Sequence, residues 1–175
     1  MFKEKLSSYG FQWKDLGNVE EGRPNLGPTT LVAVYRLMQY TMRSVLITEY
    51  DPEIAGQILF KAGKLAGSEF CKSVLDTKLE FNEFVSELQE KLKSMKIGIL
   101  RVEKADLEKM EFVLTVDEDL DCSGLPFVGE TVCDYDEGFI AGVLDTYTGK
   151  KFDVKEIDCW ASGERTCRFS VKLKS

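Results

Sequence analysis

Five cysteines are the residues of this 175-residue chain whose chemistry is easiest to define. Cys133, Cys159 and Cys167 gather towards the C-terminus, whereas Cys71 stands alone in a predicted helix and Cys122 has no evident partner. A cysteine can form a disulfide, bind a metal as its thiolate, or pack as a small buried apolar side chain. For the isolated Cys71 we predict the last of these roles.

Cys159 and Cys167 lie on two strand-like segments that residues 161–165 join as a predicted hairpin. If the chain turns about Gly163, the two thiols lie nearly opposite each other and can meet. Three interpretations remain: a disulfide, a pair of free thiols, or two ligands of a metal ion. A structural disulfide is disfavoured because a reducing cytoplasm keeps thiols free.

A zinc ion at this hairpin would need two further ligands. Cys133, close to the start of a predicted helix, can supply one, and the carboxylate of Glu156 can supply the other. Glu156 precedes Cys159 by three residues, which is the wrong parity for one face of a regular strand. The arrangement therefore predicts a bulge or strand end near Ile157 or Asp158.

The other candidate motifs fall short of a site. Asp117, Asp119 and Asp121 alternate like the start of a calcium loop, but the positions of its glycine and its closing glutamate hold Cys122 and Val128. We expect a solvated acidic turn there. The absence of histidine excludes Ser-His-Asp and Cys-His catalytic groups and imidazole metal sites. We identify no catalytic residue and predict that the protein is not an enzyme.

Charge and hydropathy narrow the class of partner. The formal net charge is −7, and residues 110–149 hold ten Asp or Glu and no Lys or Arg. Without a basic stripe, binding to nucleic acid is disfavoured. No apolar run approaches the roughly 18 residues of a membrane span, and the N-terminus does not resemble a secretory signal. We expect a cytoplasmic protein that does not bind membranes.

Residue periodicity predicts the elements that position these groups. Residues 1–28 are expected to form an arm or loop, and residues 29–175 a single ligand-binding domain. Helices are expected from Thr29 to before Asp51, over Pro52–Val74, over Phe81–Met95, and from an N-cap at Thr131 to Gly149; strands are expected over Ile97–Glu103, Glu111–Val116, Lys151–Trp160 and Thr166–Lys172. This order predicts an α+β fold, with helices packed on an antiparallel sheet of about four strands.

Gly56, Gly63 and Gly67 share one face of the second predicted helix, although glycine weakens a helix interior. Close approach of another segment explains such a stripe, and that segment is either a neighbouring helix or a second subunit. The first predicted helix carries an apolar face as well. We predict a homodimer through this helical half.

Aromatic residues are frequent in the C-terminal half, where they fill a core or line a pocket. Between the last predicted helix and the sheet, the candidate ligand-binding residues are Phe112, Phe139, Val143 and Trp160.

From Cys133 onward the chain resembles the C-terminal half of the 4-vinyl reductase domain family. The resemblance rests on Cys133 and the run Glu156-x-x-Cys159-x7-Cys167-x-Phe169. This family includes the small-molecule input domains of phenol- and xylene-responsive activators. The resemblance implies a fold like that of TRAPP subunits and of NO-signalling and Golgi-transport ligand-binding domains, a homodimer, and a zinc ion held by Cys133, Glu156, Cys159 and Cys167.

The resemblance favours a non-catalytic, hydrocarbon-binding sensor of a small hydrophobic or aromatic molecule, with a structural zinc and a downstream protein partner. Phenol itself is disfavoured, because phenol sensors fix the hydroxyl with a polar ring and this chain has no histidine. The alternative is a dimeric interaction or scaffold module of the same fold without a small-molecule ligand. A third hypothesis, an accessory to a vinyl reductase in pigment synthesis, follows from the family name alone. A cavity of about 300–1,000 Å³ would separate the first hypothesis from the second.

Overall fold

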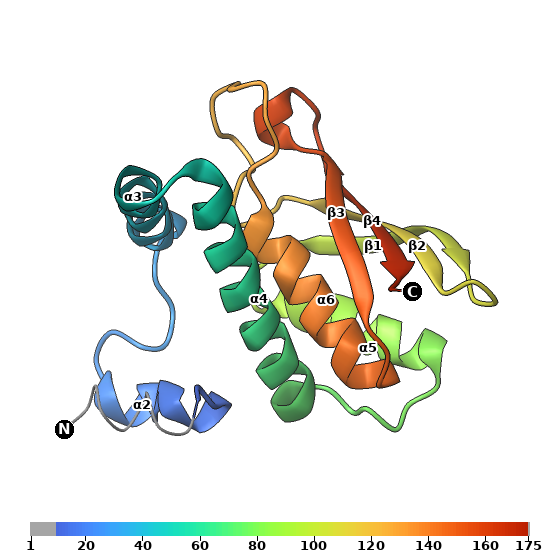
Figure 1. The fold of residues 1–175 in the computed structure, drawn as a ribbon. Helices are drawn as coiled ribbons and strands as arrows, with labels where there is room; N and C mark the ends of the chain where they lie inside the picture. The colour runs from blue at the N-terminus through green and yellow to red at the C-terminus, as the bar shows by residue number, and fades with distance from the viewer. Residues whose placement is uncertain (1–9, 175) are drawn as a thin grey trace.

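The computed structural model describes residues 10–174 (Figure 1). Its main helices are α3 (Val32–Glu49), α4 (Pro52–Val74), α5 (Phe81–Ser94) and α6 (Asp134–Thr148). The strands are β1 (Ile99–Asp106), β2 (Glu111–Asp117), β3 (Phe152–Asp158) and β4 (Cys167–Leu173). Three short helical turns complete the list: η1 (Trp13–Leu16), α2 (Val19–Gly22) and η2 (Trp160–Ser162).

The four strands form one antiparallel sheet in the order β1-β2-β4-β3. The predicted α+β class is therefore confirmed. The register between β3 and β4 shifts between Glu156 and Asp158, so the bulge that the ligand spacing required is present. Gly163 follows η2 with a φ of 107°, a left-handed conformation that favours glycine at the apex of this hairpin.

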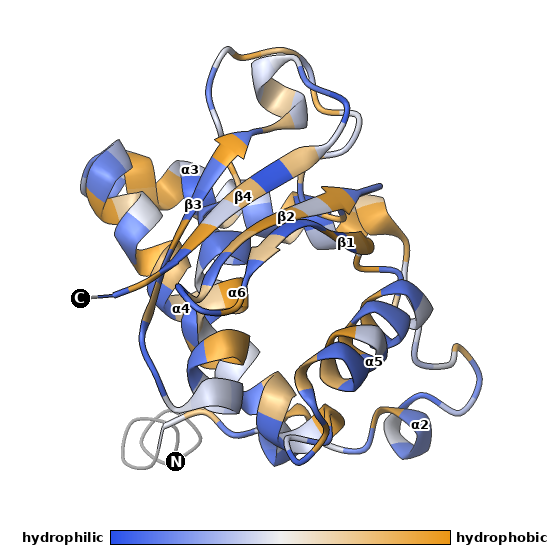
Figure 2. Ribbon diagram, turned by 90° about the vertical axis from the view of Figure 1, so that its right-hand side faces the viewer, coloured by the Kyte–Doolittle hydropathy of each residue, from blue (hydrophilic) through white to orange (hydrophobic). Residues whose placement is uncertain are grey.

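Helices α5 and α6 cover the same face of the sheet, and α4 lies against α6 (Figures 1 and 2). Buried aromatic and aliphatic side chains fill the space between these layers: Phe70, Phe84, Phe112, Phe152, Phe169, Val143 and Val171. Leu88 and Leu92 continue the apolar face of α5 towards β1. Burial of this single core stabilises the sheet and its three covering helices.

The glycine stripe belongs to the contact between α4 and α6. A Cβ atom on Gly63 would lie 1.9 Å from the carbonyl oxygen of Tyr135, and one on Gly67 would lie 2.1 Å from that of Phe139. From the other side, Gly138 and Gly142 lie equally close to the backbone of α4. The stripe thus lies inside the monomer, and the prediction that it forms a subunit contact was wrong.

Helix α3 is held differently, because none of its residues is buried. Its inner side bonds to the loop after β2 through polar side chains such as Tyr35 and Arg36. Its outer side exposes a row of apolar residues at helical spacing: Leu31, Val34, Met38, Met42 and Val45. The described residues contain no helix long and apolar enough to cross a membrane.

Two boundaries differ from the predicted ones. Helix α6 begins at Asp134 and not after an N-cap at Thr131, because Cys133 is the N-cap residue and its amide donates to the carboxylate of Glu156. Strand β1 continues to Asp106, since Lys104–Asp106 pair with β2 beyond a second register shift. The predicted arm contains the short turns η1 and α2.

Candidate metal centre and apolar cavity

Four buried cysteines converge where three segments of the chain meet. Cys122 lies in the loop after β2, Cys133 at the start of α6, Cys159 just before η2, and Cys167 at the first position of β4. Their Sγ atoms all lie within 4.8 Å of one another. Cys122 and Cys167 are 3.0 Å apart, Cys133 and Cys159 are 3.8 Å apart, and all four cysteines are free.

These separations match the donor set of a tetrahedral metal site. Four thiolates at about 2.3 Å from a zinc ion place their sulfurs about 3.8 Å apart. Contact with the neighbouring thiols, reinforced by burial, raises the pKa of Cys133, whereas the same contacts lower the pKa of Cys159 by bonding to its thiolate. Without a cation the cluster therefore favours a single thiolate, and a bound metal ion would deprotonate the others.

Cys122 corrects the sequence analysis, which found no partner for it. Its Sγ atom is the fourth member of the cluster. The chain brings it there because the Oδ1 atom of Asp119 accepts the amides of Asp121 and Cys122. The predicted solvated turn is likewise wrong, because Asp119 and Asp121 are 4% and 3% exposed.

Glu156 lies beside the cluster and bonds to the backbone. Its Oε2 atom accepts the amide of Cys133 at 3.0 Å, and its own amide donates to Glu137 at 2.8 Å. Burial, followed by the charge of Cys159, raises the pKa of Glu156 to about 8. The group of four metal-binding side chains within 4.8 Å contains Cys122 where the sequence analysis placed Glu156.

Helix α3 anchors the loop that carries Cys122. The hydroxyl of Tyr35 donates to the Oδ1 atom of Asp121 at 2.8 Å, and the amide group of Gln39 donates to Oδ2. Tyr40 donates to the backbone carbonyl of Asp121 at 3.0 Å. Burial and the nearby Asp121 raise the pKa of Tyr35. The position of α3 is thereby coupled to the cysteine cluster.

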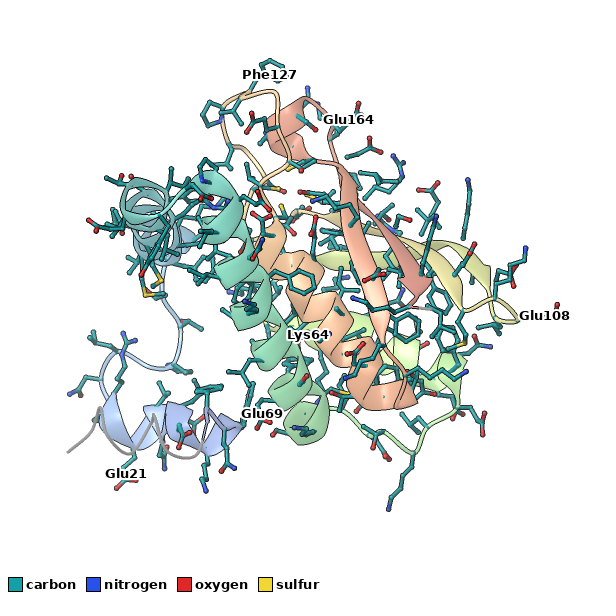
Figure 3. The ribbon with its side chains drawn as sticks, viewed as in Figure 1. Glu21, Lys64, Glu69, Glu108, Phe127 and Glu164 are labelled. Atoms are coloured by element: carbon teal, nitrogen blue, oxygen red, sulfur yellow. The ribbon has the colours of Figure 1, made fainter. Side chains whose placement is uncertain are left out.

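On the other side of this end of the molecule, the loop packs on the hairpin. Val128 and Gly129 both donate backbone hydrogen bonds to Ala161. A Cβ atom on Gly163 would lie 3.4 Å from the ring of Phe127, which Figure 3 shows at the tip of the molecule near Glu164. The segments that carry Cys122 and Cys159 thus support each other without a metal ion.

A small apolar cavity of about 60 Å³ lies between α5, α6 and the sheet. Phe112, Phe139 and Val143 line it, as the sequence analysis placed them. Trp160 does not. Its indole nitrogen donates to the carbonyl of Leu125 and its ring lies under Arg165, at a separate open hollow of the surface.

Helix α5 supplies a wall that the sequence analysis missed, through Phe81, Phe84, Val85, Leu88 and Leu92. Its amphipathic pattern was visible, but the pattern alone does not tell a core face from a cavity wall. Two carboxylates, those of Asp119 and Asp136, also line the cavity. Burial raises the pKa of both groups, that of Asp119 to about 7 with the Asp121 charge as a further cause.

Comparison with known proteins places this fold in a family. Residues 112–173 match the model of the 4-vinyl reductase domain, which confirms the resemblance. The uncharacterized protein MJ0150 of Methanocaldococcus jannaschii is 32% identical over 117 residues, which are 67% of this chain and 64% of that protein. MJ1642 of the same organism is 33% identical over 99 residues, 57% and 58% of the two chains. The matched region spans less than two thirds of each relative.

Three solved structures share the fold at low sequence identity. The phenol-responsive sensory domain of the transcription activator PoxR, solved with phenol, has a TM-score of 0.63 at 14% identity, covering 84% of this chain and 76% of that one. A vinyl-4-reductase family protein from Methanocaldococcus jannaschii has a TM-score of 0.62 at 18% identity, covering 96% and 100%. A trafficking protein particle complex subunit 3 from Naegleria fowleri, covalently bound to palmitic acid, has a TM-score of 0.65 at 16% identity, covering 82% and 95%. The predicted TRAPP-subunit-like fold is confirmed.

Proposed function

We propose that this chain, whose residues 112–173 match the 4-vinyl reductase domain, is a non-catalytic binding domain for a small hydrophobic or aromatic molecule. The observation that carries the proposal is the apolar cavity between α5, α6 and the sheet, with Phe112, Phe139 and Val143 in its wall. The phenol-bound PoxR domain of the same fold supports it. A downstream protein partner would receive the signal.

The size of the cavity sets a condition on this function. At about 60 Å³ it lies below the roughly 300–1,000 Å³ of ordinary small-molecule sites. A ring-sized ligand therefore requires the wall to move. Helix α5 is the wall that we propose to move, because its main contact is with the edge strand β1, whereas α6 is locked against α4 by the glycine contacts.

We further propose that the cysteine cluster holds a structural zinc ion. Four buried thiolates in a closed, approximately tetrahedral group suit zinc, and such a site leaves no open coordination position for catalysis. The ion would join the loop after β2, the start of α6 and the hairpin. Glu156 would then orient the amide of Cys133 beside the metal, as groups behind metal ligands commonly do.

A scaffold or interaction module is the second candidate, and the outer side of α3 favours it. The charged residues Arg36 and Arg43 turn inward, where they bond to the carbonyls of Leu120 and Val132. The outer row from Leu31 to Val45 is left apolar and without charge, which suits contact with the same row of a second copy. We propose a homodimer through α3, compatible with either function.

A cavity-filling variant tests the binding function. Ile140 lines the cavity, so Ile140→Phe should block ligand entry, whereas Ile157→Phe adds the same volume on the exposed bulge of β3. We expect small aromatic compounds to raise the melting temperature of the wild type and of Ile157→Phe but not of Ile140→Phe. If no compound of a broad apolar panel stabilises the wild type, and native mass spectrometry finds no copurified molecule, the scaffold function replaces the binding function.

A further inference from the structure

The cavity wall is apolar except at one end, where two carboxylates meet. Asp119 follows β2 and Asp136 lies in the first turn of α6. One oxygen atom of each carboxylate and the Sγ atom of Cys133 lie within 4.8 Å of one another. All other residues of the wall are aliphatic, aromatic or glycine. The cavity therefore has an apolar body and an acidic end.

Asp136 lacks the partners that the other buried carboxylates have. Its Oδ2 atom is sealed from solvent without a hydrogen-bond partner, and no hydrogen bond among the described residues 10–174 involves its side chain. By contrast, Asp121 bonds to Tyr35 and Gln39, and Asp145 bonds to Lys64 and to the amide of Phe152. The missing partner is thus a property of the cavity end and not of buried acids in this fold.

Asp119 is only partly satisfied. Its Oδ1 atom accepts two backbone amides, whereas Oδ2 has no hydrogen bond to the described residues. A buried carboxylate oxygen without a donor costs free energy, and two such oxygens close together raise that cost. A group placed between them that donates hydrogen bonds would remove it. A ligand with a donor at one end supplies such a group.

We propose that the cavity selects small apolar molecules that carry a hydrogen-bond donor, a hydroxyl or an amine, and that Asp119 and Asp136 bind this donor. The inference rests on the proposed binding function and adds the ligand class to it. Anionic ligands are excluded by charge repulsion, and pure hydrocarbons leave the two carboxylates unsatisfied. The acid pair would supply the acceptor that a histidine would otherwise provide.

A metal ion is a poorer occupant of this end than an organic donor. The only soft ligand near the two carboxylates is Cys133, and its Sγ atom already belongs to the group of four cysteines. Hard cations require six or more oxygen ligands, whereas the remaining wall offers apolar side chains. The apolar body next to the acids favours a molecule with both characters.

Matched ring compounds test the inference. Toluene, phenol and aniline have similar size and differ in the group on the ring, and benzoate carries a negative charge. We would measure their dissociation constants by calorimetry for the wild type, Asp136→Leu and the control Asp153→Leu. Asp153 is an exposed carboxylate on β3 that pairs with Lys174, outside the cavity.

For the wild type and the control, phenol and aniline should bind about tenfold more tightly than toluene, as expected for a bond to a buried acceptor. Benzoate should not bind. In Asp136→Leu the preference should vanish while toluene still binds, and the melting temperature without ligand should rise because an unpartnered acid is removed.

Each departure from this pattern has a distinct meaning. Equal affinity of the wild type for toluene, phenol and aniline overturns the donor selection and leaves the binding function intact. Absence of binding by all compounds overturns the binding function, and the inference falls with it. A lower melting temperature of Asp136→Leu without ligand shows a structural acid and also overturns the proposal.

Discussion

Cys122 shows what residue spacing can and cannot locate. Cys133, Cys159 and Cys167 were grouped from the sequence because a short hairpin and a helix start hold them at regular intervals. The path of Cys122 depends on Asp121, which bonds to Tyr35 on a helix far away in the chain. No local pattern encodes that contact, so the fourth cysteine could not be placed from the sequence.

The first prediction distinguishes Cys122 from Glu156 as the fourth ligand. Cys122→Ser should lower the metal content of purified protein, because a hydroxyl is a poor zinc ligand in a thiolate site. Glu156→Gln should retain the metal, since the amide oxygen of glutamine still accepts the bond from Cys133. Elemental analysis of protein never exposed to a chelator measures one zinc per chain, or its loss.

Cys71→Ser is the control for this prediction, because Cys71 is buried in α4 outside the cluster. Loss of zinc in Glu156→Gln, together with full zinc content in Cys122→Ser, would return the fourth position to Glu156. Full zinc content in both variants would contradict a four-ligand site that uses either residue.

At the scale of elements, the periodicity of apolar residues located each of the main helices and strands, with ends shifted by a few residues. It succeeded because each element buries one face, and a buried face has the period of its backbone. It did not show which element α4 would pack on. Gly138 and Gly142 of α6 complement Gly63 and Gly67, a match between distant segments that becomes apparent only when both helices are placed.

The second prediction tests this helix contact. Gly63→Ala should destabilise the monomer by about 1–3 kcal/mol or more, because its Cβ atom would lie 1.9 Å from a backbone oxygen and the helices must separate. Gly56→Ala, in the same helix, meets only the end of the Asp134 side chain and should be neutral or stabilising. Urea unfolding measures both changes. Equal stability of the two variants would contradict the packing argument.

The third prediction concerns the exposed side of α3. Met38→Glu together with Val45→Glu places charges in the apolar row, and we expect the proposed dimer to dissociate because burial of charge is costly. Light scattering on a size-exclusion column should show monomer for this variant and dimer for the wild type. Lys61→Glu, on the exposed side of α4, should remain a dimer. A monomeric wild type at micromolar concentration would sink the dimer proposal.

At the scale of the whole molecule, the two ends of the sheet are stabilised by different means. Around the cavity, aromatic pairs join α5 and α6, and the rings of Phe84 and Tyr147 stack at 3.8 Å. At the cysteine end, loops and the hairpin meet through a few backbone bonds and the thiols. The sequence pointed to an apolar region, but Trp160 joined the second end and not the cavity, because η2 turns its ring towards Leu125.

This division leads to the last prediction, on metal removal. A zinc ion would replace contacts between thiols by four bonds that tie the loop after β2, α6 and the hairpin, so its loss should lower the melting temperature. Hydrogen exchange should then accelerate at residues 119–133 and 159–167. The contact between α4 and α6 should stay protected, because Lys64 pairs with Asp145 at 2.9 Å (Figure 3) and the glycine backbones remain in contact.

Readdition of zinc to the chelated protein should restore both the melting temperature and the slow exchange, and Cys167→Ser should show neither recovery. Because Tyr35 and Gln39 bond to Asp121, the inner side of α3 should loosen together with the loop. Uniform acceleration of exchange across all elements would instead show that the cysteine end and the core unfold as one unit. Unchanged exchange after verified metal loss would mean that the hairpin and loop contacts alone hold this end together.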